Sequence, residues 1–111
     1  MVNQLNKEDF EKEAEALVED KLKSLHALSY TDAADLPNAV PEDIVIAGKE
    51  VQLTVFKQTE IASLPEAVLI TLQVVRAGLG GIINYQLERG LIFFVDGQVR
   101  EATEGELLAT G

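Results

Sequence analysis

Near its N-terminus the chain carries apolar residues at every third or fourth position. This spacing places their side chains on one side of a helix, so it predicts an amphipathic helix from about Asn6 to Leu28. Asn6 is a favourable N-cap, and Glu8 and Asp9 suit the positive end of the helix dipole. The apolar stripe consists of Phe10, Ala14, Leu17, Val18, Leu22, Leu25 and Leu28.

The helical period stops over residues 29–43. Pro37 and Pro41, together with several Asp and Asn residues, predict a loop there, with one helical turn after Thr31. We interpret this stretch as a connection between the helix and a sheet. It lies within a single expected domain that covers residues 1–111.

After the loop, apolar and polar residues alternate in short runs. Strands are expected at Ile44–Ala47 and Glu50–Phe56, joined by a type II′ turn at Gly48-Lys49, because a Gly-X pair between strand-like runs is typical of such hairpins. Thr59–Pro65 is a further predicted loop. The apolar run Ala67–Val75 predicts a central strand.

Two later segments are less regular. Ile82–Leu87 fits either a strand or a short helix closed by Gly90, and its β-branched residues favour a strand. Thr103 followed by Glu106 has the spacing of a capping box, which predicts one helical turn that carries Leu107.

The clearest hairpin signal is Asp96-Gly97, between expected strands at Leu91–Val95 and Gln98–Glu101. One long helix and four or five short strands joined by tight turns predict an α+β fold. We expect the N-terminal amphipathic helix to pack on a four- to five-stranded antiparallel sheet.

The strands Ala67–Val75 and Leu91–Val95 present apolar side chains on both faces of the sheet. One helix, about 10 Å wide, covers only part of one face, and exposed apolar area costs about 25 cal/mol per Å². We therefore expect the second face to be buried against another copy of the chain or another protein. The expected interface residues are Leu69, Val75, Ile82, Tyr85, Ile92 and Phe94. Strong curling of the sheet, or a cover formed around Leu107, is the alternative.

The composition restricts the partners. Nineteen acidic residues against nine basic ones give a net charge of −10, which disfavours nucleic acids and anionic membranes. The absence of cysteine excludes disulfides and thiolate metal sites. No secretory signal and no apolar run near the roughly 18 residues of a membrane span is found, so we expect a cytoplasmic protein.

Candidate chemistry is sparse. The single histidine, His26, follows the helix stripe close to Tyr30, but no paired nucleophile or orienting group can be identified, and the negative helix end explains its position. Four carboxylates match no EF-hand spacing and suit turns and caps better: Asp32, Asp35, Glu42 and Asp43. We expect no catalytic residue, no metal site and no cofactor.

The leading hypothesis is a non-enzymatic interaction or accessory domain of bacterial type, forming a homodimer through the second sheet face. The first alternative is an inhibitor or adaptor that docks a basic partner through an acidic helix face, composed of Glu8, Glu11, Glu15 and Glu19. The second alternative is a small-molecule binder or enzyme with its pocket between helix and sheet.

Overall fold

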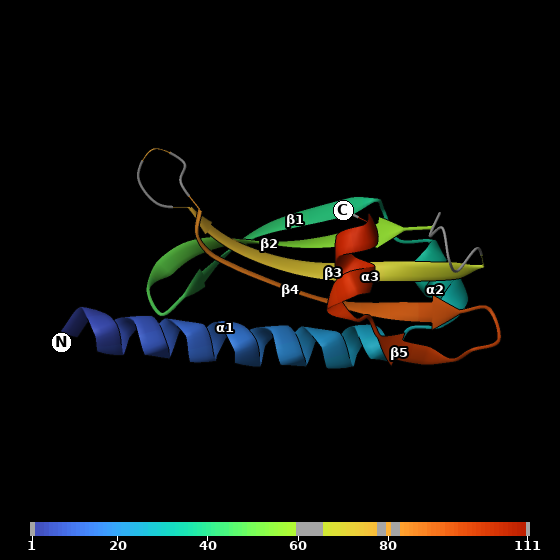
Figure 1. Ribbon diagram of the computed structural model, residues 1–111, viewed down its shortest axis with the longest axis horizontal. Helices are drawn as coiled ribbons and strands as arrows, with labels where there is room; N and C mark the ends of the chain where they lie inside the picture. Colours follow the sequence, from blue (N-terminus) through green and yellow to red (C-terminus); the bar gives the residue numbers. More distant parts are fainter. Residues whose placement is uncertain (1, 60–65, 78–79, 81–82, 111) are drawn as a thin grey trace.

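The structure, a computed structural model, describes residues 2–59, 66–77, 80 and 83–110 (Figure 1). Its elements are α1 (Val2–His26), α2 (Tyr30–Ala34), β1 (Ala39–Ile46), β2 (Lys49–Gln58), β3 (Ala67–Ala77), β4 (Ile83–Phe94), β5 (Val99–Glu101) and α3 (Glu104–Thr110). The strands form one antiparallel sheet in the order β1-β2-β3-β4-β5. The predicted α+β fold, with the N-terminal helix on a four- to five-stranded antiparallel sheet, is confirmed.

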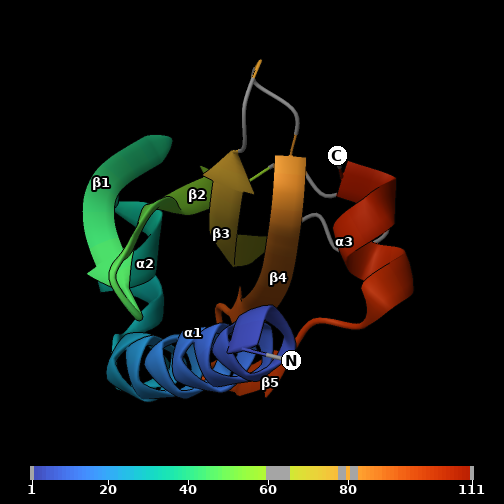
Figure 2. The same cartoon turned by 90° about the vertical axis from the view of Figure 1, so that its left-hand side faces the viewer.

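Helix α1 lies along one face of the sheet, which we call the inner face (Figure 2). The predicted stripe packs there: its buried members are Phe10, Ala14, Val18 and Leu22. They share one buried cluster with alternate residues of β3, namely Val68, Ile70, Leu72 and Val74. Helix α2 extends this cover through buried Ala33, and Ser29 caps it by accepting a hydrogen bond from the N–H of Asp32. The helical turn expected in this loop is therefore present.

Two strands continue through residues at which the sequence predicts an interruption or a loop. Strand β4 passes through Gly90 without a break, because pairing with β3 continues along its length, with Thr71 opposite Gly90. Strand β1 begins at Ala39 and contains Pro41, for which the sequence predicts a loop. It lies at the edge of the sheet, where the missing N–H of a proline interrupts no ladder.

The first hairpin turn differs from the predicted type. Ile46 pairs with Lys49, so the turn residues are Ala47 and Gly48 rather than Gly48-Lys49. Both have positive φ, 49° and 76°, which defines a type I′ turn and not type II′. The Glu13 carboxylate, on α1, accepts a hydrogen bond of 2.9 Å from the N–H of Ala47. This contact joins the hairpin tip to the helix.

The opposite, outer face of the sheet is partly covered by α3 (Figure 1). Leu69 and Ile92 are each only 1% exposed and pack with Leu107 of α3. A Cβ atom on Gly90 would lie 2.9 Å from Cδ2 of Leu107, so the missing side chain lets α3 approach closely. Our expectation that Leu69 and Ile92 are left uncovered by the chain is wrong, because α3 supplies the cover.

The predicted capping box holds the start of α3. The N–H of Thr103 donates to the Glu106 carboxylate at 2.8 Å, and the N–H of Glu106 donates to Oγ1 of Thr103 at 3.2 Å. Arg100 adds two bonds of 2.7 Å to the Glu106 carboxylate. The guanidinium of Arg100 also lies over the ring of Phe94, 5.6 Å from its centroid. These contacts dock the short helix on β4 and β5.

Candidate functional site

The pairing between β2 and β3 stops before either strand ends. The last pair is Gln52 with Val75, although β2 begins at Lys49 and β3 continues to Ala77. Beyond this pair, β2 stays paired only with β1, and β3 only with β4. The β1–β2 hairpin bends toward α1, whereas the adjoining ends of β3 and β4 rise away from it (Figure 1). The divergence opens a cleft of about 540 Å³.

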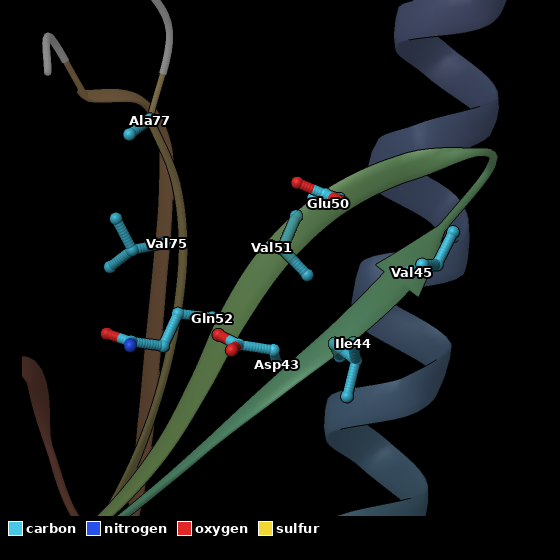
Figure 3. A pocket seen from close by; sticks show the side chains of 8 residues that line it. All are labelled: Asp43, Ile44, Val45, Glu50, Val51, Gln52, Val75 and Ala77. Atoms are coloured by element: carbon cyan, nitrogen blue, oxygen red, sulfur yellow. The ribbon is translucent and has the colours of Figure 1, made fainter.

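The cleft combines apolar and acidic side chains (Figure 3). Its lining consists of Asp43, Ile44, Val45, Glu50, Val51, Gln52, Val75 and Ala77. Val51 is buried, while Val45 is 67% exposed. The carboxylates of Asp43 and Glu50 are both exposed, and Asp43 lies opposite Gln52 in the β1–β2 ladder. The cleft is therefore an open surface of mixed polar and apolar lining, with two carboxylates beside it.

Backbone groups also point into the cleft. The N–H of Lys57 donates to the C=O of Asn38 at 2.9 Å. Because backbone groups alternate in direction along a strand, the N–H and C=O of every second residue of β2, counted from Lys57, point to β1. The backbone groups of the residues between them point to β3. Glu50 is one of these intervening residues. The register would place it opposite Ala77, but the ladder ends at Gln52. The N–H and C=O groups of Glu50 and Ala77 are therefore directed into the cleft and have no partner across it, although each residue is paired on its other side, with Val45 and Ile83 respectively.

The outer face around the cleft carries one sign of charge. Its side chains on β1 and β2 are Ala39, Pro41, Asp43, Val45, Glu50, Gln52, Thr54, Phe56 and Gln58, and β3 adds Thr71, Gln73 and Val75. This surface, within the described chain, contains carboxylates and no Lys or Arg. The side chain of Lys49 lies on the inner face, because side chains alternate along β2, and it lines a separate groove with Lys12 and Glu13. A cation from outside the chain would meet no like charge here.

The residues predicted as an interface do not form one exposed patch. Leu69, Ile92 and half-buried Phe94 lie beside or beneath α3, and of the predicted residues that the structure describes only Val75 lines the cleft. Tyr85 lies on the inner face instead, where its ring meets that of Phe10 edge-on at 5.1 Å. Ile82 lies outside the described residues. Whether any of these residues contacts a partner stays a prediction.

His26 lines a groove of about 260 Å³ between α1 and the β4–β5 edge. Arg89 also lines this groove and is paired with Glu19, at 2.6 Å, and with Glu101. In the part of the chain that the structure describes, no hydrogen bond or ion pair joins His26 to another side chain. The groove thus holds an internally paired arginine and no assembled acid–base arrangement.

The acidic face of α1 is partly occupied by intramolecular contacts. Glu19 of this face binds Arg89, and Glu13, which is not part of the face, binds the hairpin tip. Glu11 and Glu15 lie near Tyr85: burial, together with the carboxylates of Glu15 and Glu11, raises the pKa of the Tyr85 phenol. The carboxylates of this face therefore contribute to the packing of α1 on the sheet as well as to surface charge.

The carboxylates noted in the loop also separate in the fold. Asp32 lies in the first turn of α2 and Asp35 caps its end, while Glu42 lies 4.0 Å from Lys21. No group of His, Asp and Glu side chains suited to a metal ion occurs within residues 2–59, 66–77, 80 and 83–110. Asp43 alone of this set reaches the cleft. The sequence gives no signal that pairs it with Glu50, since their proximity depends on the β1–β2 register.

Comparison with known proteins adds no functional information. A scan against models of protein families finds no match, and searches of curated proteins and of solved structures return none. Among the described residues, no helix is both long and apolar enough to cross a membrane.

Proposed function

We propose that this protein is a small acidic protein-interaction module that binds a positively charged segment of a partner protein at the cleft between its two splayed hairpins. The observation that carries this proposal is the charge of the site. Asp43 and Glu50 flank an open cleft of mixed polar and apolar lining, and the outer face of β1, β2 and β3 around it, as far as it is described, contains no basic side chain. Like charges brought together across an interface are unfavourable, and opposite charges favour binding and register.

The same observation favours a cationic partner over a second copy of the chain. In a dimer that buried this surface symmetrically, carboxylates would face a surface without Lys or Arg. A chain with a net charge of −10 also repels its own copies at long range. In addition, α3 already covers Leu69 and Ile92, which removes much of the apolar area that would favour self-association.

The test is a selection of short random peptides displayed on phage against the immobilised chain. Recovered clones are measured against two variants with equal charge change, Asp43→Asn/Glu50→Gln at the cleft and Glu11→Gln/Glu15→Gln on α1. We expect Lys- or Arg-rich clones that bind the wild type and the α1 variant but lose binding to the cleft variant. Because such contacts are exposed, added salt should weaken them.

Three outcomes would overturn the proposal. Clones that depend on Glu11 and Glu15 instead would assign binding to the acidic helix face. Selection of apolar, uncharged clones would remove the role of Asp43 and Glu50. A tight dimer in sedimentation velocity that Asp43→Asn/Glu50→Gln weakens would assign the cleft to a second copy of the chain.

A further inference from the structure

We infer that the positively charged segment binds as an extended strand inserted between β2 and β3, an inference that rests on the proposed function. The interrupted ladder supports this mode. Glu50 and Ala77 would form its next pair after Gln52–Val75, yet the two hairpins diverge there. Peptide segments often bind proteins by adding a strand where backbone N–H and C=O groups are unpaired.

An inserted strand would use both walls of the cleft. Successive N–H groups of an extended chain point in opposite directions, so alternate residues would bond to Glu50 on β2 and to Ala77 on β3. Addition at the outer edge of β1 would use only one set of N–H groups, and Pro41 removes one backbone donor from that strand. The cleft therefore differs from the β1 edge in bonding to both sets of the segment's N–H groups.

The inner and outer faces of the sheet at the cleft determine which types of side chain the segment should carry. Residues of an extended strand alternate between the faces of a sheet. On the outer face they would meet the carboxylates of Asp43 and Glu50, which favours Lys or Arg. On the inner face they would meet buried Val51 and half-buried Ile44, which favours small apolar residues. The inferred ligand is a segment in which basic and apolar residues alternate.

The experiment uses a labelled, acetylated Lys-Val-Lys-Val-Lys amide and the full chain, with affinity measured by fluorescence anisotropy. Two further peptides carry N-methyl groups, one on the valines and one on the lysines. A net hydrogen bond contributes about 1 kcal/mol, so we expect each N-methylated peptide to bind at least about fivefold more weakly. Asp43→Asn/Glu50→Gln should weaken the unmodified peptide about fivefold, and Glu11→Gln/Glu15→Gln, the matched control, should weaken it less.

The outcomes that contradict the inference can be distinguished from one another, provided that circular dichroism shows both variants to be folded. If N-methylation of both kinds has no effect while Asp43→Asn/Glu50→Gln still weakens binding, the strand mode is wrong and the proposed function stands. If only one N-methylated peptide is weakened, the segment adds to a single edge and insertion is wrong. If no peptide binds and the phage selection also yields no cationic clone, the proposed function fails together with the inference.

Discussion

At the tip of the first hairpin, Ala47 has a backbone conformation that alanine rarely adopts. Its φ of 49° is the one positive value at a non-glycine residue in the described chain, and this region costs a residue with a Cβ atom about 1–2 kcal/mol. The hydrogen bond from its N–H to Glu13 helps to hold it there. Asparagine tolerates this conformation and is favoured before glycine in type I′ turns. We expect Ala47→Asn to raise the free energy of unfolding by about 0.5–1 kcal/mol.

The measurement is urea unfolding followed by circular dichroism, with Ala16→Asn as the control. Ala16 is exposed on α1, where asparagine is a poorer helix former than alanine and should lower the free energy of unfolding by about 0.5 kcal/mol. Opposite signs for one substitution at two exposed sites would show that turn conformation decides the effect. A loss of stability in Ala47→Asn would contradict the type I′ assignment.

At the scale of elements, the contact between β4 and α3 depends on Gly90. A Cβ atom there would lie 2.9 Å from Leu107 and 3.2 Å from the C=O of Ile70, so Gly90→Ala crowds the space beneath α3. We expect it to lower the free energy of unfolding by about 1–3 kcal/mol. In a Leu107→Ala background the loss should be smaller by about 1 kcal/mol. Equal losses in the two backgrounds, measured by urea unfolding, would mean that the crowding involves β3 and not α3.

The capping box of α3 makes stability depend on pH. The hydrogen bonds from Arg100, with further help from the N–H of Thr103, lower the pKa of the Glu106 carboxyl from 4.5 to about 2. Because this pKa is lower in the folded chain than in the unfolded one, the carboxylate stabilises the fold above about pH 4.5. That contribution is lost as the pH falls toward about 2.

The Glu106→Gln variant isolates this effect, because glutamine keeps the capping geometry but does not titrate. We expect the wild type to be more stable than Glu106→Gln near pH 6, with the difference disappearing as the pH falls through the window from about 4.5 to about 2. Thermal unfolding at a series of pH values measures it. A difference that is constant over this range would show that Arg100 does not hold the carboxylate.

The elements were predictable where local chemistry decides them. The stripe through Phe10 and Val18 predicts α1, and the Thr103–Glu106 spacing predicts the start of α3. Prediction was less accurate where pairing with a neighbour overrides local preference. Gly90 has little intrinsic tendency to extend a strand, yet the residues before and after it both pair with β3. Pro41 reads as a loop residue, but an edge strand tolerates it.

At the scale of the whole molecule, two features depend on relations between elements that lie far apart in the sequence. The sequence shows that Leu69 and Ile92 belong to a second apolar face, but whether the short segment around Leu107 can cover them depends on where β5 directs the chain. The cleft depends on the point at which β2 and β3 separate. Both depend on where distant elements lie relative to one another, which the apolar pattern of each element does not determine by itself.

The cover formed by α3 should control how the molecule associates. Leu107 packs on the cluster around Leu69 and Ile92, so Leu107→Asp should detach α3 and expose this apolar surface. Exposed apolar surface costs about 25 cal/mol per Å², which favours association of the variant. We expect the variant to bind an apolar dye and to sediment as larger species at micromolar concentration, more strongly than the wild type. Gly105→Asp is the control, since Gly105 is exposed and its Cβ would have no close contact. If Leu107→Asp sediments and binds dye as the control does, the surface beneath α3 has no tendency to self-associate.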